Sequence, residues 1–382
     1  MNTSPEEEQD LKLKLRLMRY FWHNGYLVRK NVSIVESLDK HQYTDIDVLA
    51  IKIDEELNTN YLVCDCKSGM RAKTHERLFW LSGIMKYFNA NQGIFLRTKL
   101  FGVKYMELAK RLDITPLSEE QLYELEKAYK IDINKSLGAF SNEPTPIDQV
   151  FLSLRKLGGN VEEYINTSYW NDVPSVQINN LVACCKRINE LDGLMEKARN
   201  FLLAYTFSHL SLSALQFSKT LLTIPNSNKE EYAKIELLGG KLAHEERKRL
   251  LKGFYEFMAK EIKERYKAKY PISSNQFVES FVPDYSKYFV EFAIRTCENP
   301  KYSFLIPRFF DLLAFQTVIG NRDIEIKDLL PIPLNEDIAT LIKPVKDFET
   351  FATRSGLLPT ELNELINKQL TNLELNSKHS EK

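Results

Sequence analysis

Two apolar segments decide the fold: TDIDVLAIKI (residues 44–53) and YLVCDCK (residues 61–67), separated by the polar run DEELNTN (residues 54–60). Apolar runs of this length predict buried strands, and a run rich in Asp, Glu and Asn predicts a turn. The two strands are therefore expected to pair antiparallel. Asp47 opens the apolar part of the first strand. Asp65 and Lys67 close the second strand and project from one face, because side chains alternate along a strand.

Helices and strands are expected on both sides of this hairpin. Residues 5–23 predict a helix, because acidic residues precede strong helix formers and Asn24-Gly25 follows as a stop. Residues 26–35 predict a strand. Downstream we expect a helix, a strand, a helix, a strand and a capped helix, at about 75–89, 93–98, 103–112, 113–117 and from Ser118 onward. This order predicts an α/β domain over residues 1–130, with a mixed sheet flanked by helices.

The sequence changes character after this domain. Residues 131–175 carry Asn, Pro and Ser in the manner of a connecting segment, and residues 176–375 predict a mostly α-helical domain. The polar residues 376–382 are expected to form a disordered tail. The amphipathic stretches predict helices at about 177–191, 194–222, 229–269, 273–281, 285–297, 304–318, 334–351 and 359–375.

Composition indicates a cytoplasmic protein that does not enter a membrane. The polar N-terminus does not resemble a signal peptide, and the most apolar stretch, residues 201–222, contains His209, serines and Lys219. Five cysteines without CxxC spacing indicate reduced thiols. The formal net charge is zero, but residues 1–112 hold 18 basic and 14 acidic residues. This mild positive excess is compatible with a polyanionic partner and does not require one.

The hairpin itself suggests chemistry. Two carboxylates that converge at a sheet edge repel each other unless a cation lies between them, and Mg²⁺ or Mn²⁺ prefers such oxygen ligands. A neighbouring lysine can orient a water and stabilise charge on a phosphate. Asp47, Asp65 and Lys67 thus predict a metal-dependent phosphodiesterase site. The alternative is that the D-x-K tripeptide arose by chance, since strands commonly end in polar residues at water.

The order of these features resembles the PD-(D/E)xK, or restriction-endonuclease-like, nuclease superfamily over about the N-terminal third of the chain. The resemblance is carried by four segments: GYLV (residues 25–28), TDIDVLA (44–50), YLVCDCKSG (61–69) and RLFWLSG (77–83). It implies a restriction-endonuclease-like fold, with Asp47 and Asp65 as metal-binding carboxylates and Lys67 as the catalytic lysine. The backbone carbonyl of Cys66 would be a further metal ligand.

The resemblance also directs attention to residues around this centre. Many members of the superfamily place a glutamate of the first helix against the metal, and Glu8 and Asp10 are the candidates here. Asp45 is a candidate for an additional ligand. Arg71, Lys73 and Arg77 are expected to contact phosphate, or else to form a solvated basic loop. Residues 241–269 contain ten Lys and Arg with five Glu interleaved among them, which favours a solvated, self-paired helix over a DNA-binding stripe.

The leading hypothesis is an Mg²⁺-dependent endonuclease that hydrolyses DNA phosphodiester bonds, in restriction, phage defence or DNA repair. The helical domain would recognise substrate, regulate cleavage, or contact a protein partner or a second copy of the chain. The second hypothesis is a catalytically inactive member that binds nucleic acid or acts as a scaffold. The third is an RNA nuclease.

Overall fold

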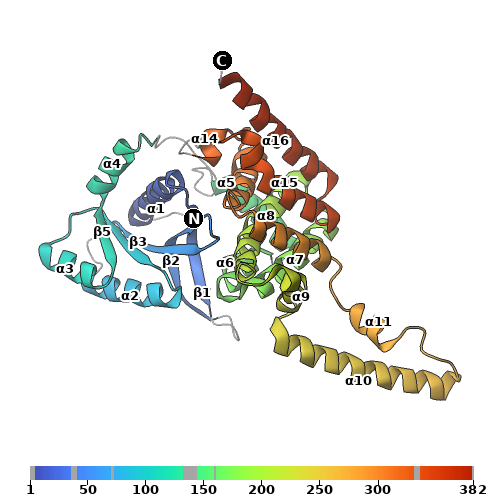
Figure 1. Cartoon of the computed structure of the whole chain (residues 1–382). Coiled ribbons are helices and arrows are strands. Elements are labelled where there is room, and N and C mark those ends of the chain that lie inside the picture. The colour runs from blue at the N-terminus through green and yellow to red at the C-terminus, as the bar shows by residue number, and fades with distance from the viewer. Residues whose placement is uncertain are drawn as a thin grey trace.

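The structure is a computed structural model that describes residues 5–35, 41–69, 73–131, 144–158, 161–330 and 336–380. It combines an N-terminal sheet flanked by helices with a mostly helical remainder, as Figure 1 shows. The expected fold class is confirmed at this level.

The sheet follows the chain order. Its described strands are β1 (Leu27–Val35), β2 (Gln42–Ile53), β3 (Thr59–Lys67), β4 (Gln92–Arg97) and β5 (Ile114–Ser118). Strands β1, β2 and β3 pair antiparallel, and β4 and β5 then continue the sheet in parallel. The turn between β2 and β3 is closed by Asp54, whose Oδ1 accepts hydrogen bonds from the amides of Glu56 and Asn58. The predicted hairpin is therefore confirmed.

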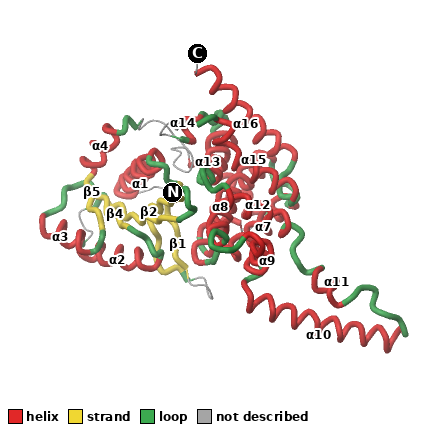
Figure 2. Tube along the Cα trace, viewed as in Figure 1, coloured by secondary structure: helices red, strands yellow, loops and turns green. Residues whose placement is uncertain are grey.

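Helices cover both faces of this sheet. Helix α1 (Pro5–His23) lies on one face, and α2 (Thr74–Tyr87) and α3 (Val103–Arg111) lie on the other (Figure 2). Although residues 11–17 alternate like a strand, Leu13, Leu17 and Phe21 are buried four residues apart, so burial of that face favours the helix. Helix α4 (Glu119–Ala128) begins at the capping box of Ser118 and Gln121, as predicted.

The helical part is built around α8 (Glu196–Thr220), which is buried on nearly all sides, as its apolar sequence predicted. Helices α7 (Pro174–Glu190) and α13 (Leu305–Leu312) and the π-helix η3 (Leu313–Ile319) make the most extensive contacts with it. The other described elements of this part are α5 (Pro144–Lys156), α6 (Val161–Asn166), η2 (Ser168–Asn171), α7 (Pro174–Glu190), α9 (Asn226–Leu237), α10 (Gly240–Tyr266), α11 (Ser274–Glu279), α12 (Ser286–Glu298), α13 (Leu305–Leu312), η3 (Leu313–Ile319), α14 (Ile326–Leu329), α15 (Ile338–Arg354) and α16 (Thr360–Ser380).

Three expectations about this part need correction. The expected connecting segment 131–175 is helical in much of its described length, and Val150, Leu154 and Tyr169 within it are buried in the core. The helix expected over 229–269 is interrupted at Gly239, whose φ of +98° ends α9 before α10 begins. The tail expected from residue 376 continues α16 as far as Ser380.

Two buried arginines join the sheet to the helical part. Arg29 of β1 forms an ion pair with Asp311 of α13 and also donates hydrogen bonds to Ser208 and His209 of α8. Arg308 of α13 lies over the ring of Trp22 in α1, with its guanidinium carbon 3.9 Å from the ring centroid. A single core of buried apolar residues runs through both parts. The helices are thus part of the same folded body as the sheet.

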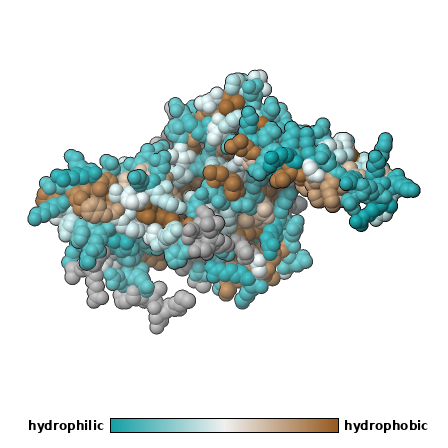
Figure 3. Space-filling view, turned by 90° about the horizontal axis from the view of Figure 1, so that it is seen from below, coloured by the Kyte–Doolittle hydropathy of each residue, from teal (hydrophilic) through white to brown (hydrophobic). Residues whose placement is uncertain are grey.

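Two surface features stand out. Helices α10 and α11 extend away from the body as an arm (Figure 1), and none of the described side chains of α10 is buried. The space-filling view shows apolar atoms at several places on one face, including the end opposite the arm (Figure 3). Leu100, Val103 and Met106 are exposed in and just before α3. No helix in the described part of the chain has the length and apolar character needed to cross a bilayer.

Candidate active site

The candidate site lies where strands β2 and β3 separate. Their backbone pairing ends at Val48 and Cys64, so the next facing positions are Asp47 and Asp65. Beyond that point a side chain replaces the backbone as the partner of β3. Oδ2 of Asp47 accepts a hydrogen bond of 2.8 Å from the amide of Cys66. Asp47 is 4% exposed and Asp65 is fully buried. A carboxylate buried to this degree requires a charged or hydrogen-bonding partner.

Lys67 provides a partner for both carboxylates. Its Nζ lies 3.1 Å from Oδ2 of Asp47 and 3.6 Å from Oδ1 of Asp65. The structure therefore brings together the three residues that the sequence singled out. We call Asp47, Asp65 and Lys67, together with the two cations described next, the carboxylate–cation cluster.

Lys14 of α1 is a member of the cluster that the sequence analysis missed. Its Nζ lies 2.7 Å from Oδ1 of Asp47 and also donates a 2.9 Å hydrogen bond to Oδ1 of Asn31. The side chain is 14% exposed. A signal was present, because Lys14 precedes the buried Leu17 and Met18 by three and four residues and so shares their face of the helix. A charged residue on a buried face needs a partner.

Arg77 of α2 completes the cluster from the other face of the sheet. Its Nε and Nη2 donate to Oδ2 and Oδ1 of Asp65 at 2.7 and 2.5 Å, in a bidentate pair. Its guanidinium carbon also lies 4.1 Å from the ring centroid of Trp80, so the ring packs against the guanidinium. Arg77 was expected to contact phosphate directly. In the structure it contacts the carboxylate on which the metal was expected.

The two carboxylates differ in their tendency to hold a proton. Burial works to raise the pKa of Asp47, but Lys14 and Lys67 outweigh burial and lower that pKa below its usual value. Burial dominates at Asp65 and raises its pKa, although Arg77 opposes the shift. Burial also works against the charge of Lys67, yet the two carboxylates raise the pKa of its ammonium. Lys67 therefore holds its proton more firmly beside the two carboxylates than an isolated lysine does.

The first helix approaches the cluster differently from expectation. Glu8 pairs with Lys12 at 2.8 Å on the exposed side of α1 and lies outside the cluster. Asp10 accepts a 2.6 Å hydrogen bond from the amide of Ser68, the residue that follows Lys67. Asp10 thus anchors α1 to the end of β3. The side chain that α1 presents to the carboxylates is the ammonium of Lys14 rather than an acid.

The remaining candidate residues occupy less central positions. Asp45 is exposed on β2 and acts on Arg77 only through longer-range electrostatics. Lys73 pairs with Glu76 at 2.8 Å at the surface. Cys66 contacts the cluster through its amide, whereas its carbonyl was expected to be the ligand. Arg71 lies outside the described residues.

The oxygen atoms of the cluster are of the type that Mg²⁺ prefers. Asp47, Asp65 and the carbonyl of Cys66 are hard oxygen donors, and Mg²⁺ is commonly held by one or two carboxylates with water and substrate oxygens completing its shell. Among the described residues, however, no three carboxylate, histidine or cysteine side chains gather as a metal-binding group. Each carboxylate is also paired with a cation other than Lys67. The donors fit the metal by type, provided that Lys14 and Arg77 move away.

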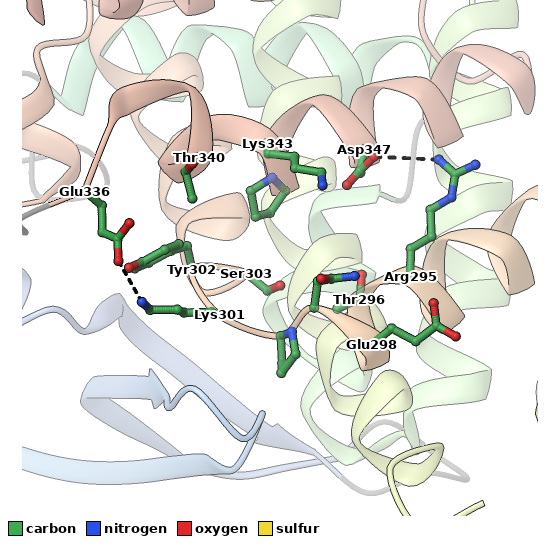
Figure 4. A pocket seen from close by; sticks show the side chains of 13 residues that line it. Arg295, Thr296, Glu298, Lys301, Tyr302, Ser303, Glu336, Thr340, Lys343 and Asp347 are labelled. Atoms are coloured by element: carbon green, nitrogen blue, oxygen red, sulfur yellow. Dashed lines mark hydrogen bonds and ion pairs between the residues drawn. The ribbon is translucent and has the colours of Figure 1, made fainter. Parts of the chain in front are cut away.

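A hollow lies in the helical part, between the end of α12 and α15 (Figure 4). It has a volume of about 370 Å³ and is lined by charges of both signs. These charges largely satisfy one another, because Lys301 pairs with Glu336 at 2.8 Å and Arg295 with Asp347 at 3.7 Å. Unlike the carboxylate–cation cluster, this hollow has no buried carboxylate pair.

Comparisons of the chain with known protein families, with curated proteins and with solved structures found no match.

Proposed function

We propose that the N-terminal α/β part is a metal-dependent nuclease of the restriction-endonuclease-like class that hydrolyses DNA phosphodiester bonds. The observation that carries the proposal is the position of Lys67, whose ammonium lies within 3.6 Å of both Asp47 and Asp65 where two buried strands separate. Two buried carboxylates beside one partly exposed lysine repel each other, because like charges destabilise each other at low dielectric. Functional sites accept such a cost.

The order of elements supports the same proposal. A helix, an antiparallel three-stranded meander, a second helix and a parallel fourth strand place the end of β3 beside the N-terminal half of α1 and the first turn of α2. Each of these elements contributes one cation to the cluster: Lys67, Lys14 and Arg77. The resemblance noted in the sequence implies this order as well.

The roles of the side chains follow from their charges. Asp47, Asp65 and the carbonyl of Cys66 would hold Mg²⁺, which supplies a Lewis acid for the phosphate and lowers the pKa of a bound water. Lys67 stays protonated and can stabilise the negative charge that develops on the phosphate. Arg77 presents a planar guanidinium, which matches the geometry of phosphate oxygens. Trp80 holds that guanidinium at the edge of the site.

One observation favours a second candidate function. Three cations surround two carboxylates, so the cluster has a net charge of +1 before any metal binds. A centre of this charge suits a protein that binds the phosphate backbone without cutting it. The inactive, nucleic-acid-binding alternative is therefore tested beside the nuclease.

The test is cleavage of supercoiled plasmid, single-stranded DNA and RNA with Mg²⁺ or Mn²⁺. Asp65→Asn preserves the shape of the side chain and removes its charge, and we expect it to lower cleavage at least about a hundredfold, since metal-assisted stabilisation amounts to several kcal/mol. Asp113→Asn is the matched control, because Asp113 is exposed between α3 and β5 on the same sheet. Asn also tolerates the left-handed backbone at this position, where φ is +55°.

Each outcome has a meaning. Equal cleavage by wild type and Asp65→Asn, with both folded by circular dichroism, overturns the nuclease proposal. Binding of duplex without cleavage, weakened by Lys67→Met, supports the inactive alternative. If the protein cleaves RNA and leaves DNA intact, the substrate is RNA and the DNA part of the proposal is overturned.

A further inference from the structure

The cations of the cluster occupy the places that a metal requires. Oδ1 of Asp47 contacts Lys14, and Oδ2 contacts Lys67 and the Cys66 amide. Both oxygens of Asp65 are held by Arg77. A divalent cation therefore has to displace an existing partner from each carboxylate.

When no phosphate is bound, the net positive charge of the cluster disfavours the binding of a divalent cation. If Lys14 and Arg77 remain beside the carboxylates, a divalent ion raises the charge of the cluster from +1 to +3 in a poorly solvated place. A phosphodiester changes this balance, because it brings negative charge and accepts hydrogen bonds from the same lysine and arginine that leave the carboxylates.

We propose that Lys14 and Arg77 exclude divalent metal from Asp47 and Asp65 until a nucleic-acid phosphate draws these two cations away. The inference rests on the proposed function and adds its regulation: substrate and metal bind together, and neither occupies the centre fully alone. Lys14 is the decisive positioning residue, because α1 presents to Asp47 a cation where an acidic ligand was expected. Arg77 holds the second carboxylate in the same way from α2.

Both side chains are able to make this exchange. Arg77 is 28% exposed, so its guanidinium reaches solvent at the rim of the cluster. Lys14 has a second acceptor in Asn31, which keeps its ammonium partly satisfied when Asp47 is released. Lysine and arginine also have long side chains with several rotatable bonds, so the displacement requires no backbone movement.

The experiment measures metal binding, not cleavage. Mn²⁺ alone is titrated by calorimetry into the full chain as wild type, Lys14→Met and Lys14→Gln. We expect Mn²⁺ to bind the two variants at least about tenfold more tightly than wild type, because one positive charge near the ion has been removed. Lys12→Met is the matched control, since Lys12 lies on the same helix but pairs with Glu8 at the surface.

Thermal unfolding gives a second readout. Mn²⁺ should raise the Tm of Lys14→Met without DNA, and should raise the Tm of wild type only when a DNA duplex is present. The double variant Lys14→Met with Asp47→Asn should lose the Mn²⁺ effect. Lys14→Gln tests the same point if Lys14→Met fails to fold, because glutamine retains a polar group opposite Asn31.

Two results would overturn the inference: wild type binding Mn²⁺ alone as tightly as the Lys14 variants, or no gain of Mn²⁺ binding in a folded Lys14 variant. Either result leaves the dependence of cleavage on Asp65 untouched. Conversely, loss of the nuclease proposal leaves the Mn²⁺ measurement valid, so the two failures are distinguishable.

Discussion

Arg29 of β1 and Asp311 of α13 form an ion pair across the junction of the sheet and the helices, with Nη1 and Oδ1 2.9 Å apart and no more than 5% of either side chain exposed. Arg29 also donates to His209 and Ser208, so its charge is satisfied from the helical side. Buried pairs of this kind are costly to break, because removing one partner leaves the other charge without solvent. The pair therefore ties the folding of the sheet to that of α8 and α13.

The first prediction concerns this pair. Arg29→Met should lower the free energy of unfolding by about 3–5 kcal/mol, because it leaves the Asp311 carboxylate buried and uncompensated. Urea unfolding followed by circular dichroism measures the change. Arg354→Met is the control, since its pair with Glu291 is exposed and should contribute less than about 1 kcal/mol. A similar loss in both variants would show that burial of the Arg29 pair has no special effect.

The second prediction is the pH dependence due to Asp47. Its pKa is lower in the folded protein than in the unfolded chain. The stabilisation it provides is therefore complete above the unfolded value of about 3.9, and is lost as pH falls through the lowered pKa. The difference in urea midpoint between wild type and Asp47→Asn should shrink between about pH 6 and about pH 3. A constant difference over this range would contradict the lowered pKa.

The third prediction is the opposite behaviour of Asp65. Burial raises its pKa, so the unfolded chain releases this proton before the folded protein does. Wild type should therefore lose stability as pH rises from the unfolded value of about 3.9 through the raised pKa of the folded state. Asp65→Asn has no such proton and should gain stability relative to wild type over the same interval. Parallel pH curves for the two proteins would refute the assignment.

The fourth prediction compares two glycines of α10. A Cβ at Gly253 meets open space among the described residues, so Gly253→Ala should stabilise the helix by about 0.5–1 kcal/mol. Gly240 has a φ of +86°, so Gly240→Ala should strain the start of α10. Hydrogen exchange of the α10 amides is the suitable measurement, because the described side chains of this helix are not buried. Equal protection in both variants would contradict the prediction.

The fifth prediction concerns thiol reactivity. Burial raises the pKa of Cys64, Cys66 and Cys185 well above the ordinary value, and raises that of Cys184 to about 11. These thiols should react with a disulfide reagent at about pH 8 far more slowly in the native protein than in urea, because the thiolate is the reactive form. Rapid labelling of Cys64 or Cys66 in the native protein would contradict the prediction and indicate that the β3 end opens in solution.

The hairpin and its chemistry were predictable because they are local. Apolar runs fix the two strands, the polar turn fixes their pairing, and alternation then fixes which face Asp65 and Lys67 share. Asp47 follows from the register of that one hairpin. The central helix α8 was predictable for a similar reason, since a helix that is apolar all round must be buried.

The partners of these residues were less accessible from sequence. Lys14 and Arg77 reach the carboxylates from helices on opposite faces of the sheet, and the meeting of three elements depends on packing rather than on spacing. The ion pair between Arg29 and Asp311 was even less predictable, because no local sequence pattern relates these two residues. The Gly239-Gly240 pair is a local signal for a break in the helix. The helix-forming residues on both sides of the pair nevertheless favoured one continuous helix.

The buried contacts between the sheet and the helices also determine whether the sheet can be separated from the rest of the chain. Trp22 and Arg29 belong to the sheet side, but Arg308 and Asp311, which contact them, come from α13, much later in the chain. A fragment that ends near residue 130 would expose an indole and a guanidinium that are buried in the intact protein. The sheet that carries Asp47 and Asp65 is therefore not expected to fold without α8 and α13. Recombination that moves it to another host protein must carry α8 and α13 with it.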